Sequence, residues 1–195
     1  VSVERADWDL VRLAGGGDKE AFRELVERYQ RRVLAVVMGM LHDREAALEV
    51  TQETFIKAFR SIGRFKGDAS FYTWVYRIAV NLAIDHQRRE WRRPLADSTR
   101  TSGNDGQTED LLDRIGDEDP RGDPFEATKD SQLRARVLEA IDELTPDHKA
   151  VILLRELEGL SYEEISRVMQ CSKGTVMSRL HYARKKLQAR LKEFV

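Results

Sequence analysis

The stretch from Gly159 to Leu191 constrains the fold more than any other part of the chain, because it places two helix starts close together. Ser161 stands three residues before Glu164, which is the spacing of a capping box, and Leu160 with Ile165 has the spacing of a hydrophobic staple. Ser172 is a second candidate cap, so only residues 170–172 remain for the turn. Two short helices joined by so tight a turn are the layout of a helix-turn-helix.

The second of these helices has one apolar side and one polar side. The apolar residues recur at helical spacing, at Val176, Leu180, Ala183, Leu187 and Leu191. Opposite them fall Ser178, His181, Tyr182 and Lys185, with Arg179 and Arg184 on the flanks. In a helix-turn-helix such a helix enters a major groove, and its basic residues attract phosphates. The alternative is a plain helical hairpin with a solvated basic face, but the repeated cap and staple favour DNA binding.

Helical periodicity also dominates residues 1–93. We expect a short helix from Trp8 to Leu13, a long one capped by Asp18, a third capped by Asp43 and a fourth capped by Ser70. The third helix would bury Ala47, Thr51, Phe55, Ala58, Phe59 and Ile62 and present Glu49, Gln52, Glu53 and Ile56 outward. The fourth would bury Phe71, Trp74, Val75, Ile78 and Leu82 and present Thr73, Arg77, Asn81 and Arg88.

The outward side of the fourth helix suits unpaired bases better than duplex DNA. It combines guanidinium groups with an amide, and aromatic residues lie nearby in sequence at Phe65, Tyr72, Tyr76 and Trp91. Single strands are held by backbone charge together with base stacking. For Tyr72 and Tyr76, the favoured interpretation is that they simply cover the core.

Residues 94–128 differ abruptly from the rest. Helical periodicity vanishes there, and Gly, Pro, Ser, Thr and acidic residues accumulate. This composition predicts a flexible acidic linker between two helical domains, at residues 1–93 and 129–195. After it we expect a helix through Leu133 and Leu144, then one that starts at Thr145 and Pro146 and carries Val151, Leu154 and Leu157. The fold class predicted is therefore all-α, with two small helical domains.

Composition limits the function classes. Of the 195 residues, 34% are charged and 41% hydrophobic, and the net charge of -1 hides a separation of acidic and basic segments. Cys171 is the only cysteine, and the longest apolar run, Val33 to Leu41, is too short to span a membrane. We therefore expect a cytoplasmic protein without membrane insertion. An enzymatic, metal or redox site built from Cys171, His148 and His181 has weak support, because Cys171 is better explained as a staple residue.

With both halves laid out, the sequence resembles the extracytoplasmic-function (ECF) sigma factors of bacterial RNA polymerase. The first half carries Gln52-Glu53-x-Phe55, Phe65-x-Gly67, Phe71, Trp74 and Arg77-Ile78-Ala79-x-Asn81, like region two of that family. The second carries Gly159-Leu160-Ser161-Tyr162-x-Glu164-Ile165 and Ser172-x-Gly174-Thr175-Val176-x-Ser178-Arg179-Leu180-His181-x-Ala183-Arg184, like region four. The resemblance covers nearly everything except the linker. The pair of motifs in one short chain is more specific than either alone.

The resemblance implies a role for each surface. Polymerase binding would fall to Glu49, Gln52, Glu53 and Ile56. The melted minus-ten element would be held by Phe65, Lys66, Gly67, Asp68, Arg77, Asn81 and Arg88, with one base flipped out. The minus-thirty-five duplex would be read by Lys173, Thr175, Ser178, Arg179, His181 and Arg184. The family commonly has aspartate at the position of Glu49, so the charge is kept on a longer side chain. It often has a basic residue at the positions of Met177 and Tyr182, so the promoter read by this chain is expected to differ.

The partners implied are bacterial core RNA polymerase, promoter DNA and an anti-sigma factor, with no cofactor, no metal and no catalysis. The alternative is a stand-alone helix-turn-helix regulator whose N-terminal domain senses a ligand or dimerises. If the promoter elements lie about two and a half turns apart, about 85 Å of duplex separates them. A free linker of about 35 residues spans about 33 Å on average but can extend beyond about 100 Å. We therefore expect the polymerase to hold the two domains apart.

Overall fold

The computed structural model describes residues 6–92 and 136–192. Its regular elements are α1 (Asp7–Gly15), α2 (Lys19–Leu41), α3 (Arg44–Ser61), the 3-10 turn η1 (Ile62–Arg64), α4 (Phe71–Arg92), α7 (Pro146–Glu156), α8 (Tyr162–Met169) and α9 (Lys173–Leu191). Residues 136–142 are also helical. Every regular element in these ranges is a helix, which confirms the all-α prediction. The predicted linker, 94–128, lies outside the described residues.

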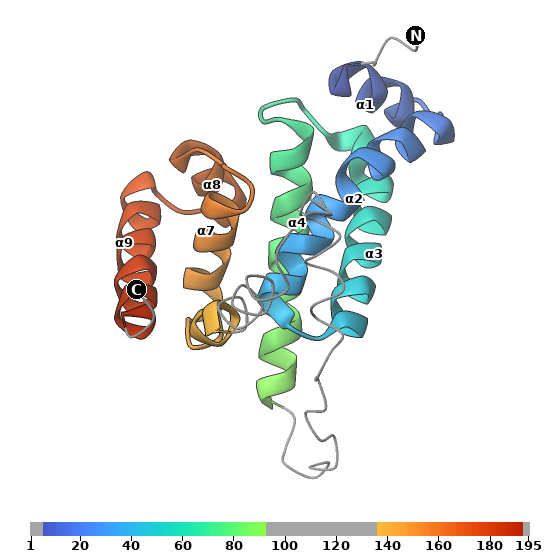
Figure 1. Cartoon of the computed structure of the whole chain (residues 1–195). Helices are drawn as coiled ribbons and strands as arrows, with labels where there is room; N and C mark the ends of the chain where they lie inside the picture. Colours follow the sequence, from blue (N-terminus) through green and yellow to red (C-terminus); the bar gives the residue numbers. More distant parts are fainter. Residues whose placement is uncertain (1–5, 93–135, 193–195) are drawn as a thin grey trace, which may run out of the picture.

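The N-terminal half, α1 to α4, begins its helices where the sequence predicts. The Asp18 carboxylate accepts hydrogen bonds from the backbone of Glu20 (2.9 Å) and Ala21 (3.1 Å), and Asp43 caps α3 through Ala46 (3.0 Å). The Ser70 hydroxyl accepts a bond from the Thr73 backbone at 3.3 Å, near the start of α4. These caps satisfy N–H groups that have no partner inside the helix. Figure 1 shows α4 lying beside α2, with α3 on the far side of α2 from the C-terminal half.

The C-terminal half, α7 to α9, contains the predicted helix-turn-helix. Ser161 and Glu164 form a complete capping box, with bonds of 3.2 Å and 2.8 Å. Ser172 caps α9 through the backbone N–H of Thr175 at 3.1 Å. The turn is made possible by Gln170, which takes a left-handed conformation at φ 52°. The apolar side of α9 is buried as expected at Val176, Leu180 and Ala183.

The two halves pack directly on one another and share a continuous apolar core. In Figure 1, α7 and α8 lie next to α2 and α4, whereas α9 is on the outer side. The helices approach closely at Gly39 of α2, where an added Cβ would lie 2.8 Å from Cδ2 of Leu153 in α7. The sequence analysis predicted two domains and did not predict that they would pack together.

Several positions differ from the sequence-based expectation, and Trp74 and Ile78, which we expected to be buried, are only partly buried. Phe59 is 41% exposed, because its ring packs on Phe22 at the edge of α3 instead of under it. Leu157 is 46% exposed, because it lies just beyond the end of α7. Thr73 is buried, and a hydrogen bond of 2.7 Å to the Ser70 hydroxyl satisfies its own hydroxyl there. The Thr145 side chain contacts His148 and does not cap α7.

No helix in residues 6–92 or 136–192 is both long enough and apolar enough to cross a membrane.

Candidate polymerase and nucleic-acid surfaces

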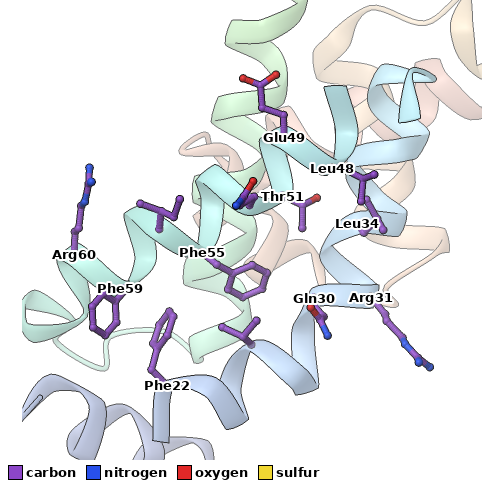
Figure 2. A pocket seen from close by; sticks show the side chains of 13 residues that line it. Phe22, Gln30, Arg31, Leu34, Leu48, Glu49, Thr51, Phe55, Phe59 and Arg60 are labelled. Atoms are coloured by element: carbon purple, nitrogen blue, oxygen red, sulfur yellow. The ribbon is translucent and has the colours of Figure 1, made fainter. Parts of the chain in front are cut away.

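An apolar groove of about 1030 Å³ runs between α2 and α3. Figure 2 shows Phe22 and Phe55 directed into the space between the two helices, and Arg31 and Arg60 directed outward from them. Leu48 and Ile56 of α3 line it and are 45% and 43% exposed. An apolar groove with basic and acidic residues at its rim is the form of a site for a partner helix.

The groove gathers three of the four residues expected to bind polymerase. Glu49, Gln52 and Ile56 all line it. Glu53 does not. It pairs with Lys57 at 2.9 Å and lines a separate polar hollow between α3 and α4, together with Arg88. Glu53 therefore shares a hollow with Arg88, one of the residues predicted to hold the minus-ten strand.

The loop that follows η1 carries four of the residues expected to hold the minus-ten strand. Phe65 is half-buried in an aromatic cluster, with its ring 5.1 Å from that of Trp74 and 6.4 Å from that of Trp8. Lys66, Gly67 and Asp68 are exposed. Gly67 has φ +77°, which a residue with a side chain rarely adopts. The loop thus presents polar groups on a framework of packed rings.

One face of α4 presents the remaining minus-ten residues. Arg77, Asn81 and Arg88 follow one another at spacings of four and seven residues, so they lie along one side of the helix. Asn81 and Arg88 are exposed and Arg77 is half-buried. The neighbouring face, at Tyr76, is turned toward the C-terminal half and is fully buried. The structure therefore separates the aromatic residue from the polar face.

The exposed side of α9 carries the residues expected to read duplex DNA. Ser178 and His181 are exposed, together with Met177 (55%) and Tyr182 (53%). Thr175 is half-buried, and its hydroxyl contacts that of Ser172 at 2.9 Å. The Tyr182 ring packs on that of His148, with centroids 4.7 Å apart.

The basic residues of α9 are paired with carboxylates of the C-terminal half. Arg184 donates to Glu156 at 2.7 Å, Arg179 pairs with Asp147 at 3.3 Å, and Lys173 pairs with Glu163 at 2.7 Å. The hydrogen bond from Lys173 is the main reason that the pKa of Glu163 lies below its ordinary value. Phosphates would therefore have to compete with these carboxylates.

A buried carboxylate joins the two halves. The Glu158 side chain is only 4% exposed and accepts from Arg32 of α2 at 2.8 Å. It also faces the Tyr76 hydroxyl of α4. Burial, followed by the interaction with Glu158, raises the pKa of Tyr76. A carboxylate removed from water needs such partners, because desolvation without them is costly.

Further polar contacts cross the same boundary at two places. The Tyr72 hydroxyl donates to Glu164, and Arg167 donates to the backbone carbonyl of Asp68 at 3.1 Å. The C-terminal half therefore touches the loop predicted to hold the minus-ten strand.

The second place is near the end of α2. There Lys149 is buried and donates to Asp142 at 2.6 Å and to the carbonyl of Met40 at 3.4 Å. His42 lies 2.7 Å from the same carboxylate. Burial by itself would raise the pKa of Asp142, but the hydrogen bonds from His42 and Lys149 outweigh it and hold that pKa low.

The candidate enzymatic residues are not brought together. Cys171 is half-buried and its sulfur lies 3.9 Å from Arg179, while His148 contacts Thr145 and His181 is exposed. Among the described residues, no group of three or more His, Cys, Asp and Glu is placed to hold a metal ion.

The comparisons with known proteins decide the family. The family model of sigma-70 region 2 matches residues 25–93, and that of sigma-70 region 4 matches residues 134–187. The chain is 42% identical to the RNA polymerase sigma-H factor of Pseudomonas aeruginosa, over 98% of each chain. It is 40% identical to the ECF RNA polymerase sigma-E factor of Haemophilus influenzae, again over 98% of each. The chain belongs to the ECF sigma factors.

Solved structures support the fold of this sigma factor. One is CnrH in complex with the cytosolic domain of CnrY, which has a TM-score of 0.70 at 25% identity and covers 98% of this chain and 100% of CnrH. Another is the sigma factor RpoE in complex with the anti-sigma factor NepR from Bartonella quintana. It has a TM-score of 0.63 at 22% identity, over 89% and 98% of the two chains, and shows a shared fold. The family result favours a promoter-directing factor over a stand-alone regulator.

Sequence reasoning missed the residues that join the halves. Glu158 and Lys149 read as ordinary charged residues of a helical domain, and nothing local shows that a partner half will bury them. The signal available was Tyr76, an aromatic residue next to the polar face of α4 that needed a cover. The contact of Trp8 with the 65–70 loop was also missed, because Trp8 is distant from that loop in sequence.

We expect Glu158→Ala to loosen the contact between the halves by about 1 to 2 kcal/mol. The change leaves Arg32 and Tyr76 without their carboxylate, but Arg32 is half-exposed and water replaces part of the loss. The radius of gyration in small-angle scattering should rise. Glu156→Ala is the matched control, because Glu156 pairs with Arg184 inside the C-terminal half. An equal radius for the wild type and both variants would contradict this role of Glu158.

Proposed function

We propose that this sigma factor uses three separate surfaces to direct transcription. The α2–α3 groove binds the polymerase, the 65–70 loop with α4 holds the melted minus-ten strand, and α9 reads the minus-thirty-five duplex. The observation that carries the proposal is that the region 2 match contains the α4 face and every groove residue except Phe22, while the region 4 match contains α8 and most of α9. The chain would bring about promoter opening without catalysing a reaction.

At the groove, Ile56 and Leu48 supply exposed apolar area and Glu49 and Gln52 supply polar contacts. An amphipathic helix of the polymerase would bury the apolar residues and leave its own polar side at the rim. Each fully buried aliphatic side chain contributes about 1.5 to 3 kcal/mol. The groove therefore offers more binding energy than the small polar hollow that contains Glu53.

At the minus-ten surface, the favourable contacts must offset the cost of unstacking a base, which is a few kcal/mol. Asn81 has both a donor and an acceptor amide group for a base edge. Arg77 and Arg88 lie along the same side of α4 and would attract the backbone of the strand. Opening is then the capture of a strand, with no bond broken.

At the minus-thirty-five surface, the first turns of α9 would lie in the major groove. Ser178 and His181 are exposed there, and Arg179 is the residue suited to the edge of a guanine. The pairs Arg179–Asp147 and Arg184–Glu156 would hold the guanidinium groups in place before DNA arrives.

The docked arrangement of the two halves is the unbound form in this proposal. Two promoter elements about 85 Å apart cannot both be reached while α7 and α8 pack against α2 and α4. The contacts at Glu158 and Lys149 must therefore break when the factor joins the polymerase at a promoter. The contact of Arg167 with the 65–70 loop would be lost in the same step.

An anti-sigma factor is the proposed inhibitor, acting in the cytoplasm. The support is that CnrH, which this chain matches over nearly its whole length, and the more distant RpoE were each solved with a partner bound. The exposed α2–α3 groove is the surface at which a partner helix would exclude the polymerase.

Run-off transcription tests the function directly. The purified chain, mixed with bacterial core polymerase and genomic fragments, should start transcription at a defined set of sites and so reveal the promoter sequence. Core polymerase without the chain is the control. Binding of the chain to promoter DNA in the absence of polymerase, with no transcripts in its presence, would contradict the proposal.

Substitutions at two surfaces should separate polymerase binding from promoter opening. Ile56→Glu places a charge in the apolar groove and should weaken the affinity for core polymerase by about tenfold or more. Asn81→Ala removes an exposed amide and should leave that affinity unchanged while reducing open complexes. Titration of core polymerase and permanganate footprinting measure the two effects. If both variants lost both properties, the assignment of separate surfaces would be wrong.

A disulfide across the joint should hold the factor inactive. An ideal Cβ on Gly39 lies 3.5 Å from Cγ of Leu153, and the sulfur of a cysteine at residue 153 would take the place of this Cγ. Gly39→Cys combined with Leu153→Cys can therefore form a disulfide between the halves after a small adjustment. In a Cys171→Ser background, the oxidised protein should fail in run-off transcription and reduction should restore it. Each single cysteine variant, oxidised in the same way, is the control. Full activity of the oxidised pair would show that the halves need not separate.

A further inference from the structure

We propose that Trp8 of α1 is a positioning residue that holds the 65–70 loop in the conformation that captures the minus-ten strand. The inference rests on the proposed role of that loop. Trp8 lies before residue 25, where the family match to region 2 begins. It is 55% exposed, which by itself is ordinary for a surface residue. What distinguishes Trp8 is what the covered part of its ring touches.

The covered part of the ring lies against Gly67. An ideal Cβ on this glycine would lie 2.7 Å from Cζ3 and 2.9 Å from Cη2 of Trp8, closer than real contacts allow. The indole therefore fills the place that a side chain at residue 67 would need. Because Gly67 also has φ +77°, two independent constraints require glycine there.

The ring also reaches Phe65, two residues before Gly67. Its centroid lies 6.4 Å from that of Phe65, with the planes tilted by 52°. Phe65 in turn packs on Trp74 at 5.1 Å and on Phe71 at 6.5 Å, both of which belong to α4. Trp8 thus clamps the loop from outside while α4 supports it from inside, and Lys66 stays exposed between them.

The backbone of Trp8 is itself held firmly. The preceding residue, Asp7, accepts a hydrogen bond from Arg28 of α2 at 2.9 Å and another from the Tyr29 hydroxyl. On the other side of α1, Leu10, Val11 and Ala14 are buried. A ring on such an anchored helix can restrain the loop, and a loop ordered beforehand loses less entropy when it binds a strand.

The test is a double-mutant cycle on the holoenzyme, with a promoter found by run-off transcription and carrying an unpaired bubble over its minus-ten element. Trp8→Ala should weaken binding of the bubble by about threefold to tenfold, and Trp8→Phe should retain most of the affinity. In the wild-type background, Gly67→Ala has two costs: the unfavourable φ of residue 67 and the clash of the new methyl group with the indole. In the Trp8→Ala background only the φ remains, so Gly67→Ala should cost less there.

Leu13→Ala is the control, because Leu13 is an exposed apolar residue of the same helix. It should leave bubble binding unchanged, and all variants should keep the wild-type affinity for core polymerase. Equal effects of Gly67→Ala in both backgrounds would overturn the inference, as would unchanged binding by Trp8→Ala or a parallel loss of polymerase affinity. If the wild-type holoenzyme itself failed to bind the bubble, the role proposed for the loop would be wrong instead.

Discussion

The ion pair between the buried carboxylate of Glu158 and Arg32, beside the buried ring of Tyr76, is the contact that fixes how the two halves of the molecule meet. It is the point where a charge from the C-terminal half is enclosed by α2 and α4. Apolar packing of α7 on α2 supplies area around it, but area alone does not fix how two helical layers meet. A buried charge that needs particular partners does fix it, because a shifted arrangement would leave the charge unpaired.

The same chemistry makes the joint reversible. A buried ion pair adds little net stability, since the attraction between the charges is largely offset by their desolvation. When the halves part, Arg32, Lys149 and Glu158 each regain water, and no charge is left stranded in an apolar core. The joint is thus specific in geometry and modest in energy. Those are the properties that the proposed function requires of a factor that is compact when unbound and extended on a promoter.

What the sequence predicted well was local. Asp18, Asp43, Ser70, Ser161 and Ser172 start helices where expected, because a cap depends only on the next few residues. What it predicted poorly was set by distant partners. Helical periodicity could not show that Phe59 would lie at the edge of the groove or that Tyr76 would face the C-terminal half. Nor could it show that Gln52 would line the groove while Glu53 lines a different hollow. The family resemblance predicted the three functional surfaces, but only the structure shows that Trp8 lies against the loop predicted to hold the minus-ten strand.

Pairing of charges also determines how α9 would meet DNA. Lys173, Arg179, Arg184 and Arg190 each have a carboxylate partner from the C-terminal half, which is one reason that a chain with a DNA-reading helix has a net charge near zero. DNA phosphates must displace these carboxylates from the basic side chains, or share the side chains with them. Binding of DNA therefore releases less free energy than a basic helix without carboxylate partners would give. Weak non-specific affinity follows for the free chain. In the proposed function, α9 would gain its effective affinity when the polymerase places it beside the duplex, since a tethered site binds at high local concentration.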